Sequence, residues 1–201
     1  MRSVQHVPAD LAGHPDRLKW NARYEEGFAL FEPHPLAMRA LAMPLPEGPV
    51  ADLACGRSGS VLLAAGAGRR VTAVDVSDVA LGLLSREAQR RGLGDLITLV
   101  QADLRAWGPQ PGRYALVLCT GYWDPAVFAR AAAAVAPGGL LGWEAFTAAA
   151  RRARPGMPAE WCLGAGEPAS LLGAGFEAVR QEDVPGSGRT KRRLLARRRD
   201  G

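Results

Sequence analysis

Acids and glycines stand where apolar segments of this 201-residue sequence end. The first such place is VADLACGRSG at residues 50–59, where an apolar run that contains Asp52 is followed by a turn of small residues. The missing side chains of Gly56 and Gly59, and the small one of Ala54, let the backbone approach a ligand closely. The helix expected to follow would offer unpaired amide groups to the same ligand. This stretch therefore predicts a ligand-binding turn.

Two further acids end the next two apolar runs. Asp75 lies in VTAVDVS, nineteen residues after Gly56, which is near the spacing at which a carboxylate binds ribose hydroxyls. Asp103 ends the run LVQADL. Asp75 could instead cap the next helix together with Ser77. The glycine patterns of dinucleotide and triphosphate loops are absent, and three acids suit a ligand with a ribose, an amino group and a cationic centre.

The order of the elements predicts an α/β fold with a doubly wound, Rossmann-like sheet of seven strands. The segment PGSGRT at residues 185–190 is too short for a crossover helix, so the last two strands should form an antiparallel hairpin on a mostly parallel sheet. We expect one domain over residues 1–201, with a helical lid at 15–35 and the core at 45–199. The predicted strands are 49–55, 70–76, 97–104, 114–122, 140–146, 177–184 and 191–198, and the predicted helices are 61–65, 77–91, 125–136 and 168–174, preceded by one or two helices in 15–31.

The charge of the chain is concentrated at its end. Residues 189–201 hold seven Lys or Arg and one Asp, so residues 1–188 carry a net charge of −1 within the total of +5. Because Leu194, Leu195 and Ala196 interrupt this basic segment, we interpret it as a last strand with solvated ends in preference to a phosphate-seeking arm.

The composition favours a cytoplasmic protein. No apolar run approaches the ~18 residues of a membrane span, and the first residues lack the pattern of a secretory signal. The cysteines Cys55, Cys119 and Cys162 have neither zinc spacing nor the even number of a disulfide framework. The three histidines are not spaced as ligands on one helix, and we expect no metal.

The ordered motifs VADLACGRSG, VTAVDVS, VQADL, YALVLCTGY and PGGLLGWEAF resemble those of class I S-adenosylmethionine-dependent methyltransferases over residues 15–199. The chain is most similar to the small tellurite-resistance-type and thiopurine-type methyltransferases, in which an element like WNARY at residues 20–24 covers the cofactor. The sequence departs from the family's glycine motif at two positions. Ala54 replaces the first glycine, and Ser58 stands at the position of the third, so that the glycine is displaced by one residue to Gly59.

The resemblance implies a role for each residue at the strand ends. Asp52 and the turn from Ala54 to Gly59 would hold the methionine portion, and Asp75 the ribose hydroxyls. The adenine would lie beside Val76, with its amino group bound by Asp103 and its ring packed on Leu104. Cys119 and Thr120 would line the wall after the fourth strand, and the lid residues would be Trp20 and Tyr24.

Methyl transfer from a sulfonium needs a base only where the acceptor must lose a proton. The candidates are Glu144 and Tyr122, with Asp124 and Tyr24 as further groups near the site. Glu144 closes an apolar strand, where a carboxylate is costly unless it is paired or used; a salt bridge to Arg151 or Arg152 is the alternative. Aromatic residues could form an acceptor pocket, although Trp123 and Phe146 fit an ordinary core.

The sequence therefore predicts a methyltransferase that uses S-adenosylmethionine, yields S-adenosylhomocysteine and acts on a small molecule through an O, N, S or metalloid atom. CTGYWDP replaces the motif of amino-group methylation in nucleobases, so nucleic acid is not the expected partner, and neither is a membrane. We expect a monomer or homodimer. The alternatives are an RNA or protein methyltransferase that uses the basic tail, a non-catalytic adenosyl-binding protein and, more weakly, a nucleotide-dependent oxidoreductase.

Overall fold

A single mixed sheet forms the centre of the computed structural model, which describes residues 7–27, 30–186 and 189–200. Its strand order is β3-β2-β1-β4-β5-β8-β7, and a short β6 pairs with β5. The strands are β1 Val50–Leu53, β2 Val71–Asp75, β3 Ile97–Gln101, β4 Tyr114–Thr120, β5 Val135–Thr147, β6 Cys162–Leu163, β7 Phe176–Val184 and β8 Lys191–Arg198.

The sheet is parallel except at β8, which runs antiparallel to both β5 and β7. The predicted doubly wound sheet with a C-terminal hairpin is thus confirmed, and the two-residue β6 is added to the seven expected strands. The strand order reverses between β1 and β4, so the crevice outside their carboxyl ends is the place where open α/β sheets bind ligands.

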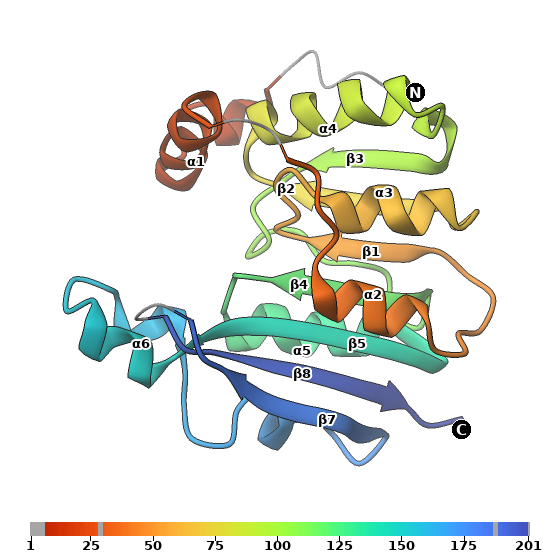
Figure 1. The fold of residues 1–201 in the computed structure, drawn as a ribbon, viewed down its shortest axis with the longest axis vertical. Helices are drawn as coiled ribbons and strands as arrows, with labels where there is room; N and C mark the ends of the chain where they lie inside the picture. The colour runs from red at the N-terminus through yellow and green to blue at the C-terminus, as the bar shows by residue number, and fades with distance from the viewer. Residues whose placement is uncertain (1–6, 28–29, 187–188, 201) are drawn as a thin grey trace.

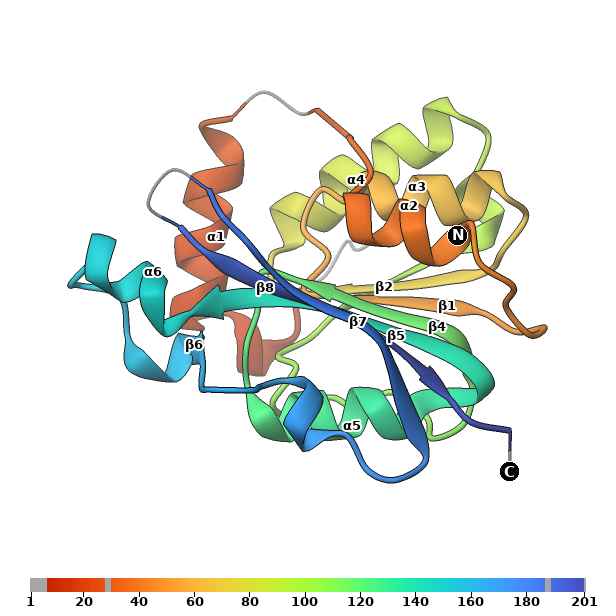
Figure 2. The same cartoon turned by 60° about the horizontal axis from the view of Figure 1, so that its bottom comes forward.

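Helices cover the sheet unequally. α2 Pro35–Leu41, α3 Gly59–Gly66 and α4 Asp78–Arg90 lie on one face, and α5 Pro125–Ala134 lies on the other (Figure 2). α1 Pro15–Glu25 lies beyond the carboxyl ends of the strands, as expected of a lid, and α6 Ala148–Ala153 follows β5 (Figure 1). Among the described residues, none of the helices has both the length and the apolar character needed to span a bilayer.

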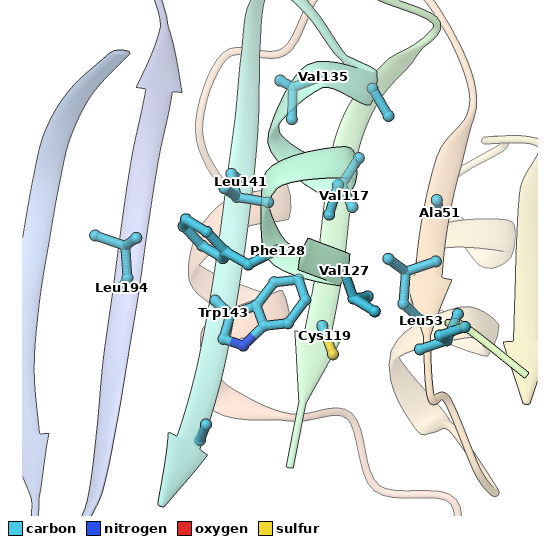
Figure 3. Close-up of a cluster of buried hydrophobic side chains, with 14 of the residues drawn as sticks. Ala51, Leu53, Val117, Cys119, Val127, Phe128, Val135, Leu141, Trp143 and Leu194 are labelled. Atoms are coloured by element: carbon cyan, nitrogen blue, oxygen red, sulfur yellow. The ribbon is translucent and has the colours of Figure 1, made fainter. Parts of the chain in front are cut away.

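The hydrophobic core is divided between these two faces. On the α5 face, Phe128 meets Trp143 edge to face with ring centroids 5.2 Å apart (Figure 3). Trp123 packs against both of these rings. This arrangement confirms Trp123 as a core residue. On the other face, the apolar sides of α2, α3 and α4 pack on the sheet around Leu84 and Leu116.

One predicted helix was wrong, and two observed helices, α2 and α6, were not predicted. In place of a helix at 168–174 there is only a 3₁₀ turn, Ala169–Leu171, because Pro168 and the glycines at 173 and 175 leave too few helix-forming residues between them. α2 was not predicted. It begins with Pro35 at its first position, and the His34 side chain caps it by accepting a hydrogen bond from the Leu36 amide.

Candidate functional site

The turn after β1 is closed by the carboxylate of Asp75. Its Oδ2 accepts a hydrogen bond from the Gly56 amide at 2.7 Å, and its Oδ1 accepts one from the Ser77 amide at 2.8 Å. Ala54 and Gly56 both adopt left-handed backbone conformations, with φ of 49° and 56°. The capping role that was the alternative for Asp75 falls to Ser77, whose hydroxyl accepts from the Ala80 amide. Asp75 therefore lies at the end of β2, beside the bare turn.

Asp52 is a second buried acid beneath this turn. Its carboxylate accepts a hydrogen bond from the Ser58 hydroxyl at 2.6 Å, and Ser58 in turn caps α3. Burial raises the pKa of Asp52 to about 7 against the lowering effect of the Ser58 hydrogen bond, and the charge of Asp75 adds to the rise. Burial likewise raises the pKa of Asp75 to about 6, although backbone amides oppose it. Both acids would gain from a nearby positive charge.

α1 is fastened over the site by polar contacts with the start of α4. Asp78 Oδ1 accepts hydrogen bonds from Arg17 Nε at 2.7 Å and from Asn21 Nδ2 at 2.9 Å. Asn21 Oδ1 also accepts a hydrogen bond from the Ser77 hydroxyl at 2.6 Å. Sequence reasoning missed Arg17 and Asn21 as anchors, although Asn21 stands inside the WNARY motif that marked the lid.

Tyr24 of α1 reaches the glycine turn. A Cβ atom added to Gly56 would lie 2.2 Å from the Tyr24 hydroxyl oxygen, so the turn and the lid are in contact here. Burial and the neighbouring charge of Asp75 raise the pKa of Tyr24 well above its usual range. Trp20 stacks on Tyr24 with ring centroids 6.0 Å apart. The structure thus brings Trp20 and Tyr24 to the predicted site.

Gly59 has a different neighbour from Gly56. A Cβ atom at Gly59 would lie 2.4 Å from the Phe31 carbonyl oxygen and 2.3 Å from the Glu32 carbonyl carbon. Its missing side chain therefore lets the chain segment between α1 and α2 cross the start of α3. Gly59 was predicted as a cofactor residue, and its conformation is explained by this crossing without a ligand.

The expected adenine side of the site lies at the ends of β2 and β3. Asp103 accepts a hydrogen bond from the Arg105 amide at 2.9 Å, and its Oδ2 lies 3.4 Å from His14 Nε2. Gln101 donates to the Val76 carbonyl at 3.1 Å, while its own Oε1 is buried without a hydrogen-bond partner among the described residues. Sequence reasoning did not single out Gln101 or His14.

Leu104 and Cys119 belong to the core on the α5 face. Leu104 is 6% exposed and Cys119 is fully buried, pointing among the apolar side chains of that face (Figure 3). Burial raises the pKa of the Cys119 thiol well above its ordinary value. The backbone of Cys119 and Thr120 still ends β4 at the switch point, but the thiol is a core group.

Tyr122 follows β4 and keeps its phenol neutral at physiological pH. Burial raises its pKa to about 12, and the nearby charges of Asp124 and Asp103 contribute to the rise while Arg105 opposes it. A phenol of this kind can donate a hydrogen bond. Because it is rarely ionised near neutral pH, it is poorly suited to take a proton from an acceptor. Asp124 caps α5 through the amides of Ala126 and Val127.

Glu144 occupies a buried ion-pair cluster. It is 1% exposed, and it accepts hydrogen bonds from Lys191 Nζ at 2.6 Å, from Arg193 Nε, and from His34 Nε2 at 3.2 Å. Burial alone would raise its pKa, but these three donors hold the pKa well below its usual range. The alternative interpretation, a salt bridge, holds, but the partners are Lys191 and Arg193 in place of Arg151 or Arg152. A carboxylate so stabilised in its charged form is a poor general base.

Comparisons with known proteins agree with this geometry. Residues 50–139, from β1 to the early part of β5, match the family described as Methyltransferase domain. This part of the chain is therefore similar to a methyltransferase domain. A probable cobalt-precorrin-6B C(15)-methyltransferase (decarboxylating) of Methanothermobacter thermautotrophicus is 38% identical over 77 residues, 35% of this chain and 40% of that protein. The chain thus matches less than half of that relative's length.

Solved structures share the fold at low sequence identity. TehB from Haemophilus influenzae superposes with a TM-score of 0.70 and 16% identity, covering 89% of this chain and 67% of that one. Magnesium protoporphyrin IX methyltransferase from Synechocystis PCC 6803, with bound S-adenosylmethionine, gives a TM-score of 0.65 and 20% identity over 94% of each chain. The shared fold thus extends beyond residues 50–139 over most of the chain.

Proposed function

We propose that the protein transfers a methyl group from S-adenosylmethionine to a small-molecule acceptor. The observation that carries this proposal is the Asp75 carboxylate, which lies at the end of β2 against the Gly56 amide, at the switch point of the sheet. The matched methyltransferase domain includes both residues. Magnesium protoporphyrin IX methyltransferase, which shares the fold, is named for a small-molecule acceptor, and this likeness supports a small molecule as the substrate class.

The residues present fit this cofactor. Each oxygen of Asp75 accepts one backbone hydrogen bond and so keeps a lone pair for a ribose hydroxyl. Asp52 and Asp75 have no cationic side chain paired with them among the described residues, and their raised pKa values favour a ligand that brings positive charge. The unpartnered Gln101 Oε1 is a free acceptor on the adenine side.

When bound, the cofactor would supply a methyl group on a sulfonium, and the reaction removes a positive charge by in-line displacement. The protein's task is then to orient the reactants and to exclude water. Tyr24 and Trp20 would cover the turn, held by the contacts of Arg17 and Asn21 with α4. Tyr122 could donate a hydrogen bond to the acceptor, while Glu144 is too well paired to take a proton.

A macromolecular acceptor is less well supported. The basic tail includes β8, and two of its arginines donate to backbone carbonyls of the fold. Arg197 donates to the carbonyls of Pro44 and Gly138, and Arg198 to that of Val135. These contacts leave less of the tail free to act as a nucleic-acid arm.

Calorimetric titration with S-adenosylmethionine, S-adenosylhomocysteine and NAD tests the proposal, after any ligand carried through purification has been removed. We expect binding of both adenosyl compounds and none of NAD. Formation of S-adenosylhomocysteine in the presence of a panel of small acceptors then tests turnover. Binding without turnover on any acceptor would favour the non-catalytic alternative, and binding of NAD alone would overturn the proposal.

A further inference from the structure

A cationic pocket lies at the carboxyl edge of the sheet, outside the turn after β1 that Asp75 closes. Its volume is about 270 Å³, and its walls come from β5, from the segment that leads into α2 and from the β7–β8 hairpin. The lining residues are His34, Glu144, Val184, Pro185, Gly186, Arg189, Lys191 and Arg193. We call this the hairpin pocket.

The hairpin pocket carries more positive charge than Glu144 neutralises. Arg189, Lys191 and Arg193 all line it, so the cations exceed the single carboxylate by two even with His34 neutral. The Arg189 guanidinium has no hydrogen bond or ion pair with any part of the chain that the structure describes. Arg193 uses Nε for Glu144, and its two terminal nitrogens donate to no group among the described residues.

Glu144 and His34 fix the positions of these cations. Glu144 Oε1 binds Lys191 and its Oε2 binds Arg193, so one buried carboxylate sets the spacing of two charged heads. His34 accepts a hydrogen bond at Nδ1 from the Leu36 amide, so a neutral ring carries its proton on Nε2, facing Glu144. Preorganised donors of this kind bind anions without a further loss of side-chain freedom.

The hairpin pocket is connected to the predicted cofactor turn. The backbone amide of His34 donates to the Ser60 hydroxyl, 3.0 Å away, in the first turn of α3. Glu144 lies in register with Thr120, the last residue of β4, which ends at the switch point. An acceptor anchored in the hairpin pocket could therefore extend along the carboxyl edge towards the methyl donor.

We propose that the hairpin pocket binds the anionic group of the methyl acceptor, so that the substrate of this protein is a small molecule with a carboxylate or a phosphate. The inference rests on the methyltransferase function proposed above. The volume of about 270 Å³ is slightly below the ~300–1,000 Å³ of whole-ligand sites, which suits one charged end of a substrate. Arginine forks match the planar carboxylate and the phosphate alike.

Anion titrations of the protein saturated with S-adenosylhomocysteine test this proposal. The probes are inorganic phosphate, benzoate and the neutral isostere benzamide, at constant ionic strength, with the backbone amide signals of residues 34 and 191 followed by NMR. Saturating first with S-adenosylhomocysteine fills the proposed cofactor site, so that the probes do not bind there. We expect saturable binding of phosphate or of benzoate, according to whether the pocket prefers a phosphate or a carboxylate, and no binding of benzamide. Equal shifts with benzamide would overturn the proposal.

Two variants locate the binding. Arg189→Gln removes a side chain without a partner, and Arg193→Lys keeps the charge but loses the planar fork, so neither should unfold the protein. Each variant should raise the dissociation constant of the preferred anion about tenfold, which corresponds to ~1.4 kcal/mol. Arg180→Gln is the matched control, because Arg180 lies on the same hairpin, pairs with Glu182 and does not line the pocket. Wild-type affinity in both pocket variants would mean that the cations serve only to neutralise Glu144.

The two proposals can fail separately. If S-adenosylhomocysteine does not bind, the proposed function falls, and the same anion titrations on the protein alone still decide whether the hairpin pocket binds anions. If S-adenosylhomocysteine binds and the anions do not, the cofactor site stands and the anionic acceptor is excluded.

Discussion

Buried carboxylates lie at two places along the same edge of this sheet, and they differ in whether cationic side chains pair with them. Asp52 and Asp75 have hydroxyl and amide donors but no cationic partner within the described part of the chain, and burial raises the pKa of each. Glu144 has Lys191, Arg193 and His34, and its pKa is held low. A buried charge that is fully paired stabilises the fold, whereas one that is left unpaired is suited to a ligand that supplies the missing charge.

The largest effect should come from Glu144→Gln. This change leaves two cations facing each other without their carboxylate, and we expect it to lower the free energy of unfolding by about 3 kcal/mol, the lower end of the range for a broken buried ion pair, since the cations are partly exposed. Urea denaturation measures it. The control is Glu182→Gln, an exposed carboxylate paired with Arg39 and Arg180 on the protein surface. If Glu144→Gln costs no more than this control, the paired and unpaired acids do not differ as argued.

Asp75→Asn should act on the ligand more than on the fold. The asparagine amide has one oxygen and no charge, so it loses a charge-assisted hydrogen bond to the ribose, which is worth about 1.5–3 kcal/mol. We therefore expect the dissociation constant for S-adenosylmethionine to rise roughly tenfold to a hundredfold. Calorimetry measures it, with Asp95→Asn, in the short turn before β3, as a control. An unchanged affinity would remove Asp75 from the cofactor site.

The pH dependence of cofactor binding distinguishes the two groups of acids further. Burial raises the pKa of Asp52 to about 7 and that of Asp75 to about 6, both above the ordinary value of 3.8. The folded protein therefore holds protons that the unfolded chain has lost between pH about 4 and 7. In this range the two acids make the free energy of unfolding fall as the pH rises.

A cationic ligand favours the ionised acids, so its affinity should rise over the same range. We expect the dissociation constant for S-adenosylmethionine to fall about tenfold from pH 6 to pH 8, as Asp52 loses its proton. Asp52→Asn should flatten this dependence, and thermal unfolding without ligand should show the opposite trend with pH. A dissociation constant that stays constant from pH 5.5 to 8 would contradict the role of these acids.

The difference between the two groups also explains what the sequence could predict. Asp75 and the glycine turn are separated by one strand–helix–strand unit with familiar spacing, so local patterns were enough to place them together. The partners of Glu144 lie 47 and 49 residues further along the chain, and they depend on the register of β5 with β8. No local pattern specifies that register, so Arg151 and Arg152, which are near in sequence, were the natural but wrong choice.

The lid and the second glycine show the same limit. WNARY predicted a cover over the cofactor, but its anchor joins Asn21 to Ser77 across 56 residues, and only the folded chain shows it. Gly59 was assigned to the cofactor because it stands in a glycine motif, while its contact with the backbone of Phe31 and Glu32 is a tertiary packing requirement. A motif identifies which residues are constrained, and the structure identifies the contact that constrains each of them.

The smallest expected effect concerns Ala54, where a left-handed residue carries a side chain. Its φ of 49° costs a non-glycine residue about 1–2 kcal/mol, and glycine would lose about 0.5–1 kcal/mol through the greater freedom of the unfolded chain. Ala54→Gly should therefore raise the free energy of unfolding by about 0.5 kcal/mol, measured by urea denaturation. Ala67→Gly is the matched control, because this exposed residue has a φ of −83° and should gain nothing from the change. Equal losses in the two variants would mean that the turn at Ala54 holds no strain.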